Sequence, residues 1–435
     1  MPFYGDIGWF YLSARDLLTK GSFPLVGITS SHIWLHQGPF WTYFLSIALW
    51  LGRFDPVAGG YLAVIIGIFT VITVFWLGRV LLSYRIGIIA AILYSTSPLV
   101  TIYSRTPYHT TPIPLFACFY FLGIYYWYQR KKSFVLPLFF LAILYNFELA
   151  TVLLSIPFII LVIWRLQKNT LKIQVASFTL NLFIGLSPLL PVVIYDFTHG
   201  FRQTLVYGIW LIYTPFKAIM GMFSSQPSSH SSILAYVFKE IQTLIFFPSG
   251  FVAIAFLGVA FVFLCTKLFQ QYQARKINRA FIIIGLWFSI TMLLLLLNNV
   301  ASDAYFPQVF PVIFLILALL VEYVYEHAKW VALFLIIGIS LVNVYSTLSH
   351  SYFEGRGEGI SLEQRENVVK KILSLSDREG IIFKGEGDGS QFRSFTMPYE
   401  YLTWYYRPAN STTHLTKIVT LTEKNYQINV KTYTQ

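Results

Sequence analysis

The sequence has little charge and little cysteine. Asp, Glu, Lys and Arg together make up 11% of its 435 residues, against roughly 25% in an ordinary soluble domain. The two cysteines, Cys118 and Cys265, lie in apolar runs far apart in the chain. These shortages argue against a soluble globular protein and against a disulfide-stapled secreted one.

Apolar and aromatic residues are abundant instead. Hydrophobic residues make up 56% of the chain and Phe, Tyr and Trp 18%, and aromatic residues are typical of membrane–water interfaces. The net charge of +12 does not indicate nucleic-acid binding, because Lys and Arg fall largely in short clusters between apolar runs. The fold class predicted is a polytopic α-helical membrane protein, with the lipid bilayer as its first partner.

Several apolar runs are long enough to cross a bilayer, which takes about 20 mostly apolar residues. A longer stretch, 134–164, is interrupted in its middle by Asn146 and Glu148. We interpret it as two short spans that meet at a polar turn, which gives about ten crossings in all. The other runs are 57–78, 86–101, 112–128, 172–195, 249–268, 280–298, 306–324 and 330–347.

The basic clusters predict the orientation. If the spans alternate, one side carries Arg79 with Arg85, Arg130-Lys131-Lys132, Arg165 with Lys168 and Lys172, and Lys267 with Arg275, Lys276 and Arg279. Cytoplasmic loops carry such an excess, so we expect a multi-pass plasma-membrane protein with this side inside. The external side then holds residues 1–56, the long loop 196–248 and the tail 349–435, around a transmembrane domain at 57–348.

The N-terminal region 1–56 predicts two surface helices. Residues 7–20 carry apolar side chains at helical spacing, with Arg15, Asp16 and Lys20 off that stripe. The segment 38–52 is short and aromatic and begins with Gly-Pro. Counting it as a span would break the charge alternation, so we expect an interfacial or re-entrant helix on the external face.

The tail 349–435 predicts a small external α/β domain, because its charge density rises and its apolar runs shorten. Ser361 and Gln364 form a capping-box pattern that opens an amphipathic helix reaching about residue 375. Residues 381–383, 417–421 and 426–430 are strand candidates. The glycine-rich run 385–389 lacks a phosphate-loop pattern and predicts a turn.

Ionisable residues near membrane level are candidates for function. Asp6 directly precedes the predicted helix 7–20, so it is either the N-cap of that helix or a catalytic acid. His32 and His36 have the spacing of helical metal ligands, but no third ligand is evident and no metal site is predicted.

Five further polar residues lie at the mouths of predicted spans. Arg105 either binds a phosphate or anchors a span to lipid head groups. His109 lies in the same loop, and Glu148 lies between two apolar half-segments, where a carboxylate is costly. Asp303 and Tyr305 lie at the mouth of a later span. Together they suit a water-soluble acceptor arriving from outside and a phosphate-bearing lipid arriving from the bilayer.

Several motifs resemble a known family. They are Gly5-Asp-Ile-Gly-Trp-Phe-Tyr-Leu-Ser-Ala-Arg-Asp-Leu-Leu, His36-Gln-Gly-Pro-Phe, Tyr103-Ser-Arg, Tyr195-Asp-Phe-Thr-His-Gly-Phe and Tyr305-Phe-Pro. In order and spacing the sequence resembles the phospholipid-carrier-dependent glycosyltransferases of the C-type (GT-C) superfamily. These include the protein O-mannosyltransferases and the transferases that add aminoarabinose to lipid A.

The resemblance implies a transferase that moves a sugar from a polyprenyl-phosphate donor, with inversion at the anomeric carbon. Asp6 matches the acid of the first external loop, which would act as general base or electrostatic partner for the acceptor. Arg105 is the candidate for the donor phosphate, with His36 and His109 as helpers. The remaining candidates for donor binding are Arg15, Glu148, Tyr305 and Asp303.

The sequence departs from the family pattern in two ways. The protein mannosyltransferases carry Asp followed directly by Glu, whereas Ile7 follows Asp6 here, which puts a protein acceptor in doubt. The family also has a spanning helix before this loop, so we expect such a helix to be missing from the start of this sequence; the alternative is a ten-span form with its N-terminus outside.

A transporter or flippase for a lipid-linked sugar is the alternative function. It would place polar groups near the midplane on broken helices, but the middles of 57–78, 280–298 and 330–347 carry no ionisable residue. Sugar, carrier and acceptor (a glycan, lipid or protein) stay open, and so does the cofactor, since one carboxylate with a phosphate could hold a divalent cation weakly.

Overall fold

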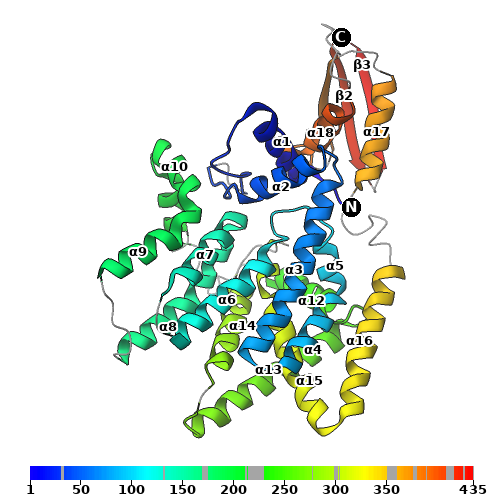
Figure 1. Ribbon diagram of the computed structural model, residues 1–435. Helices are drawn as coiled ribbons and strands as arrows, with labels where there is room; N and C mark the ends of the chain where they lie inside the picture. Colours follow the sequence, from blue (N-terminus) through cyan, green and yellow to red (C-terminus); the bar gives the residue numbers. More distant parts are fainter. Residues whose placement is uncertain are drawn as a thin grey trace.

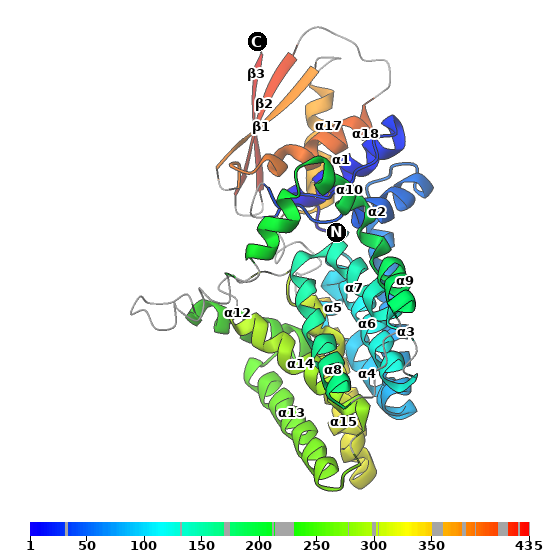
Figure 2. The same ribbon diagram turned by 90° about the vertical axis from the view of Figure 1, so that its left-hand side faces the viewer.

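The computed structural model is predominantly helical (Figure 1). It describes residues 1–30, 34–130, 133–168, 175–210, 213, 230–276, 278–297, 302, 304–349, 360–375, 380–387, 389–407, 416–424 and 427–434. Most of the chain between 58 and 349 forms a bundle of apolar helices. The N-terminal helices and a small sheet lie together at one end of that bundle (Figures 1 and 2).

The bundle confirms a polytopic membrane architecture. Within the described residues, seven helical stretches are long and apolar enough to cross a membrane. The other predicted spans correspond to α4, α6 and α7. The bundle helices are α3 (Ala58–Leu81), α4 (Tyr84–Ser95), α5 (Pro98–Tyr103), α6 (Ile113–Arg130), α7 (Val135–Phe147), α8 (Ser155–Gln167), α9 (Val175–Leu186), α10 (Leu190–Thr198), α12 (His230–Ile245), α13 (Gly250–Gln273), α14 (Arg279–Leu297), α15 (Phe310–His327) and α16 (Lys329–Ser349).

Helix α15 is the centre of the bundle. The most apolar window of its span is 72% buried, whereas the windows of the other six spans are 17–39% buried. It packs against α4, α13, α14 and α16. A helix that is apolar on all sides can be enclosed by protein, while the outer helices keep their exposed apolar faces for lipid.

Two predicted spans are broken in the structure. The run 86–101 divides into α4 and α5, because the Ser97 side chain accepts from the Val100 N–H and Pro98 opens a new helix. The described part of the run 172–195 divides into α9, the 3₁₀ turn η2 (Ser187–Leu189) and α10. Proline is tolerated in the first turn of a helix, but it lacks the N–H that would extend a helix from the residues before it. Each proline therefore ends one helix and begins the next.

The predicted external loop 196–248 contains helical structure. Residues 202–210 are helical, and α12 places Ile233, Val237, Ile241 and Leu244 in the bundle core. These apolar residues recur every three or four positions, which defines an amphipathic helix. Polar residues between them keep the mean hydropathy of the segment below that of a span, so its composition alone predicted a loop.

At the other end, α1 (Gly5–Lys20) and α2 (Phe40–Leu51) confirm the two predicted N-terminal helices. Helix α1 lies between the bundle and the C-terminal part of the chain, where it packs on η4 (Arg393–Thr396) and α18 (Met397–Tyr406). Gly8 makes this packing close, because a Cβ there would lie 2.3 Å from the Pro398 nitrogen. Gly5 allows the same close packing on η4, because a Cβ there would lie 2.8 Å from the Ser394 carbonyl oxygen.

The C-terminal part is a small α/β unit, as predicted. Helix α17 (Leu362–Ser374) has the predicted capping box, formed by Ser361 and Gln364. The sheet has the order β1–β2–β3, with β1 (Gly380–Glu386) parallel to β2 (Thr416–Lys424) and β2 antiparallel to β3 (Gln427–Thr434). Helix α18, which the sequence analysis did not foresee, lies in the crossover that a parallel pair requires.

The basic residues gather at the opposite end of the bundle from α1. The Arg279 guanidinium lies 5.3 Å from the Tyr128 ring, and Arg165 lies 5.1 Å from the same ring. The α3–α4 turn, the α13–α14 hairpin and the end of α15 also meet there. We call this the basic end, defined by Arg79, Arg85, Arg165, Lys168, Lys267, Arg275, Lys276 and Arg279.

Candidate functional site

Asp6 lies inside the first turn of α1 and does not cap it. The helix begins at Gly5, its N-cap is Tyr4, and no side chain caps it. The capping interpretation is therefore wrong, although a carboxylate in the first turn is still stabilised by the helix dipole. Asp6 Oδ2 instead accepts a hydrogen bond of 3.2 Å from the Tyr108 hydroxyl. The Asp6 carboxylate is thus held by a loop of the bundle.

Tyr108 and His109 lie in the loop between α5 and α6. The two rings are in edge contact, with centroids 4.0 Å apart, and the Tyr4 ring lies 5.5 Å from that of Tyr108. Burial, helped by the nearby Tyr4, Asp6 and Glu148, raises the pKa of Tyr108 well above its usual value. Its hydroxyl therefore stays protonated and can donate to Asp6.

Glu148 lies where the stretch 134–164 breaks, as predicted. Helix α7 ends at Phe147, and Glu148 has an extended backbone before the 3₁₀ helix η1 (Leu149–Leu154). Glu148 Oε1 accepts from the Ala150 N–H at 3.3 Å, which satisfies one of the unpaired donors at the start of η1. The second oxygen, Oε2, faces His109 at 3.3 Å. The break in the helix therefore aims a buried carboxylate at the α5–α6 loop.

Gln37 joins these two groups. Its Nε2 lies 3.0 Å from His109 Nε2 and 3.3 Å from Glu148 Oε2. Gln37, His109 and Glu148 are 6%, 1% and 7% exposed, so water cannot replace these contacts freely. Gly38 makes the approach feasible, because a Cβ there would lie 2.1 Å from Asn146 Oδ1. The Gln-Gly-Pro motif thus brings Gln37 to the α7 break.

The three contacts cannot all be hydrogen bonds at once. His109 Nε2 carries either one proton or one lone pair, so it either donates to Glu148 Oε2 or accepts from the Gln37 amide, depending on its tautomer. Two further buried atoms, Gln37 Oε1 and His109 Nδ1, have no hydrogen-bond partner among the described residues. The cluster can therefore accept or donate additional hydrogen bonds.

Tyr305 lies close to this cluster, just before η3 (Pro307–Val309). Burial and the Glu148 carboxylate raise the pKa of Tyr305 to about 12. The Tyr207 hydroxyl donates to the Leu149 carbonyl at 2.7 Å, and its pKa is raised by burial with help from Tyr145, Glu148 and Tyr305. The hydroxyls of Tyr207 and Tyr305, whose pKa values Glu148 helps to raise, therefore stay protonated.

His36 lies beside Gln37 but faces another segment. Its Nε2 is 3.4 Å from the Tyr195 hydroxyl, and its backbone carbonyl accepts from Gln203 at 2.9 Å. Burial, reinforced by His199, lowers the pKa of His36, which keeps the ring neutral near pH 7. Asp196 accepts from the Gln203 N–H at 2.9 Å, so its role here is to cap the helical residues 202–210.

The two arginine candidates have different positions. Arg105 is half-buried in the α5–α6 loop, three residues before Tyr108. Arg15 lies nine residues after Asp6 on α1, about 13 Å along the helix axis. Its guanidinium pairs with Asp16 at 2.6 Å and lies 5.3 Å from the Trp404 ring. Arg105 therefore lies in the same loop as Tyr108 and His109. Arg15 lies on the side of α1 that packs against α18.

The remaining predictions concern metal binding and two individual residues. Asp303 and His32 lie outside the described residues. Within the described residues, no group of three or more His, Cys, Asp or Glu side chains is arranged to hold a metal ion. His109 and Glu148 supply two adjacent donors, which is fewer than a closed metal site needs.

Sequence reasoning missed Gln37 and Tyr108. Gln37 lies in one of the motifs that carried the family resemblance, and Tyr108 lies three residues after another, Tyr103-Ser-Arg. Neither residue ionises near neutral pH, so a search for charged residues at membrane level passes over them. The signals that could have found them are their immediate neighbours: Gln37 precedes Gly38-Pro39, and Tyr108 precedes His109.

Comparison with known proteins gives matches at the level of structure. No protein-family model matches the sequence, and no curated protein matches it either. ArnT from Cupriavidus metallidurans, solved bound to undecaprenyl phosphate, matches with a TM-score of 0.59 and 10% identity, over 98% of this chain and 93% of that one.

A second match is the archaeal oligosaccharyltransferase AglB from Archaeoglobus fulgidus, solved with an inhibitory peptide and a dolichol-phosphate. Its TM-score is 0.52 at 12% identity, over 95% of this chain and 57% of that one. This chain thus spans nearly all of ArnT but little more than half of AglB. At these identities the likeness concerns the fold, and the chain has the fold of the C-type (GT-C) glycosyltransferases.

Proposed function

We propose that this protein is an integral membrane glycosyltransferase that moves a sugar from a polyprenyl-phosphate donor to an acceptor. The observation that carries the proposal is the convergence of Asp6, Tyr108, His109 and Glu148 at one end of this fold. In two solved proteins with the same fold, ArnT and AglB, the bound molecules include undecaprenyl phosphate and dolichol-phosphate.

Asp6 is the proposed general base. The acceptor's nucleophile attacks the anomeric carbon, the bond from that carbon to the phosphate oxygen breaks, and the acceptor's proton passes to Asp6. The products are the glycosylated acceptor and the polyprenyl phosphate. A single displacement of this kind inverts the anomeric centre. Tyr108 supports the role, because its hydrogen bond fixes one carboxylate oxygen and leaves the other to accept the proton.

Arg105 is the proposed partner of the donor phosphate. A leaving phosphate gains negative charge in the transition state, and a guanidinium stabilises it through charge-assisted hydrogen bonds. Arg105 lies in the same loop as Tyr108 and His109. For Glu148, His109 and Tyr305 we propose contacts to sugar hydroxyls, because buried carboxylate, imidazole and phenol groups accept and donate such bonds. For His36 we propose an indirect role, in which its contacts with Tyr195 and Gln203 position the neighbouring Gln37.

The proposed site faces the outside of the cell. The support is the distribution of charge, since the basic end lies opposite α1 and cytoplasmic ends of membrane proteins carry the excess of Lys and Arg. An external site would receive a lipid-linked donor from the bilayer and a water-soluble or lipid acceptor from the outer face.

The test compares Asp6→Asn with Asp16→Asn. Both lie on α1, but Asp16 pairs with Arg15 and Lys20 away from Tyr108. Membranes containing each variant are supplied with polyprenyl-phosphate sugars, and glycolipids and cell-surface glycans are analysed by mass spectrometry. We expect Asp6→Asn to lose transfer by about 100-fold or more, the scale of a general base, while Asp16→Asn retains it.

The same assay separates a transferase from a flippase. Purified protein in liposomes is given a lipid-linked sugar and an acceptor, and both movement of the lipid and the new glycosidic bond are measured. Movement without a new bond in the wild-type protein would sink the transferase proposal. Unchanged transfer by folded Asp6→Asn would remove Asp6 from its role and leave the reaction class standing.

A further inference from the structure

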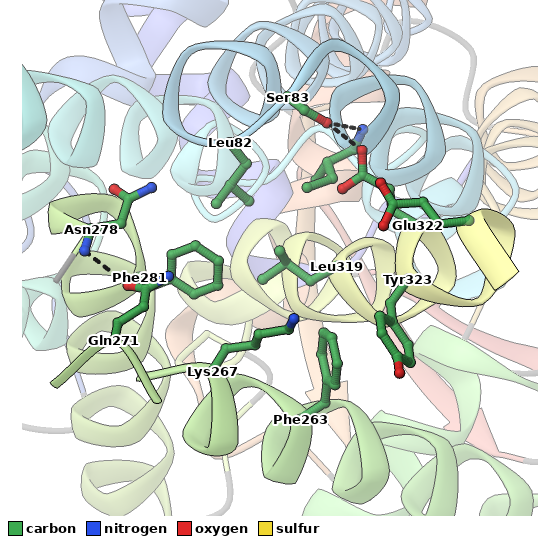
Figure 3. Close-up of a pocket in the computed structure, with 12 residues that line it drawn as sticks. Leu82, Ser83, Phe263, Lys267, Gln271, Asn278, Phe281, Leu319, Glu322 and Tyr323 are labelled. Atoms are coloured by element: carbon green, nitrogen blue, oxygen red, sulfur yellow. Dashed lines mark hydrogen bonds between the residues drawn. The ribbon is translucent and has the colours of Figure 1, made fainter. Parts of the chain in front are cut away.

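A second polar cluster lies at the basic end, remote from Asp6. A cavity of about 290 Å³ lies where the α3–α4 turn, the α13–α14 hairpin and the end of α15 meet (Figure 3). Its charged lining residues are Lys267, Glu322 and Glu326, and Ser83 lies on its α4 side. None of these residues has a part in the proposed transfer reaction.

Lys267 presents a cation to this cavity. Its ammonium lies 5.3 Å from the ring centroids of Phe263 and Tyr323, which stabilise it by cation–π interaction (Figure 3). No carboxylate among the described residues lies within ion-pair distance of it. The two ring centroids are 4.9 Å apart, so the ammonium lies beside both rings rather than between them, and it keeps N–H donors for a ligand.

Glu322 presents an anion on another wall. One of its oxygens accepts a 2.7 Å hydrogen bond from the Ser83 hydroxyl, and Ser83 is itself oriented because it caps α4 at the Ile86 N–H (Figure 3). Glu322 is half-buried, and within the described residues it has no ion pair with Lys, Arg or His. Its second oxygen is left to accept from a ligand.

The charges of the cavity select its ligand. One lysine and two glutamates, Glu322 and Glu326, give a formal sum of −1, so a purely anionic ligand is disfavoured. A ligand with both a phosphate and an amine satisfies the Lys267 cation and the glutamates together. Lys267 is on α13 and the two glutamates are on α15, and they form no ion pair with each other. The cavity therefore has separate positive and negative groups, which match the two charges of a zwitterionic ligand.

The location of the cavity points to a lipid. It lies at the ends of two candidate spans, α13 and α15. Apolar side chains are exposed along α13 just beside it, among them Val259, Val262 and Phe269, which are 57%, 61% and 61% exposed. Such a surface is suited to acyl chains, and the polar cavity at its end then lies at the depth of the lipid head groups.

We propose that this cavity binds the head group of an aminophospholipid, with the phosphate on Lys267 and the primary ammonium on Glu322 and Glu326. A primary ammonium donates three hydrogen bonds, whereas the quaternary ammonium of a choline head group donates none. The site should therefore distinguish phosphatidylethanolamine from phosphatidylcholine, which carry the same net charge.

The experiment uses the purified full chain in detergent, titrated with phosphatidylethanolamine, phosphatidylcholine or phosphatidylglycerol and analysed by native mass spectrometry. We expect phosphatidylethanolamine to bind about tenfold more tightly than either of the others, a difference of about 1.4 kcal/mol. Soluble phosphoethanolamine is added as a competitor to test whether the head group alone is sufficient.

The variants are Lys267→Met and Glu322→Gln, with Lys329→Met as the matched control. Lys329 is the first residue of α16, close in sequence to the end of α15, and lies 6.0 Å from the Tyr325 and Trp330 rings, but it does not line the cavity. We expect both cavity variants to lose the ethanolamine preference and Lys329→Met to keep it. If a cavity variant does not fold, the wild-type comparison of the three lipids still decides.

Equal binding of the three lipids, or a preference for phosphatidylglycerol, would overturn the proposal. So would a preference that persists in both folded cavity variants. Displacement of the lipid by an equal concentration of soluble phosphoethanolamine would show that the ligand is a soluble phosphoamine, which overturns the lipid assignment.

Discussion

Glu148 and Glu423 are two carboxylates of one chain in contrasting surroundings. Glu423, on β2, accepts two hydrogen bonds of 2.8 Å from Arg365 and one of 2.5 Å from Tyr399. Glu148 has contacts of 3.3 Å with Gln37, His109 and the Ala150 N–H. Arg365 neutralises Glu423, whereas the groups around Glu148 are not permanently charged.

The contrast separates a structural acid from a chemical one. A carboxylate that is paired with a buried arginine and accepts three hydrogen bonds rigidifies its surroundings and has little capacity left for a ligand. A buried carboxylate with long contacts and neutral partners is costly to the fold and is retained for interactions with something else. The Glu423 pair should therefore matter for stability, and the Glu148 cluster for transfer.

The largest expected effect on stability comes from Glu423→Gln. Removing one partner of this pair leaves Arg365, which is 2% exposed, without its counter-charge, at a cost of about 3–5 kcal/mol. Thermal unfolding of the purified protein should show it, while transfer per folded molecule stays near wild type. Glu386→Gln is the control, because its 3.5 Å pair with Lys431 is exposed and worth about 1 kcal/mol or less.

Glu148→Gln should have the opposite profile. The amide keeps the volume of the side chain but cannot accept from Gln37, His109 and a sugar hydroxyl as a carboxylate does. Hydrogen bonds to a charged group contribute about 1.5–3 kcal/mol, so we expect transfer to fall roughly 100-fold. The unfolding midpoint should move little. A large fall in stability with unchanged specific activity would make Glu148 a structural acid like Glu423.

Tyr108→Phe should have a smaller effect on the same reaction. It removes the donor to Asp6 and keeps the ring that packs on His109, so the carboxylate loses its orientation but not its charge. We expect transfer to fall about tenfold, the value of one hydrogen bond to a charged group. Tyr43→Phe removes a hydroxyl that donates to the Pro24 carbonyl instead, and it should leave transfer unchanged. Equal losses in both variants would contradict a specific role.

The smallest effect concerns His36 and pH. Burial lowers its pKa in the folded protein below the usual 6.5, so the unfolded chain binds a proton more readily than the folded one. The free energy of unfolding should therefore fall as pH decreases below about 6.5. Unfolding midpoints measured from pH 7.5 to 5 should decline less in His36→Gln. An equal slope in both proteins would show that His36 does not contribute.

Hydropathy and charge predicted the membrane class and the helix break at Glu148 because both follow from local composition. The break needs only two polar residues inside an apolar run, and a capping carboxylate that starts η1. The capping box of α17 was equally local. The helix α12 was missed because its burial depends on which bundle faces surround it, and sequence alone does not show that.

The candidate site was predicted in part for the same reason. Asp6, His109 and Glu148 stand out as ionisable residues in apolar surroundings, whereas Gln37 and Tyr108 are neutral. Arg15 belongs to the most specific motif, yet in helix α1 its side chain contacts Asp16 and Trp404. A motif fixes the order of residues, but the 3.6-residue helical period decides which of them share a face.

The sequence by itself determined that this chain is a membrane protein and which end of its helix bundle is basic. It also showed that acidic residues occur in apolar surroundings, where a charge is costly. These properties depend on the transfer of individual segments between water and lipid. Only the tertiary structure decided that Gln37, His109 and Glu148 meet, and that Tyr108 holds Asp6. Such contacts join segments as much as 111 positions apart. They depend on close backbone approaches such as the one Gly38 permits, and no local pattern specifies them.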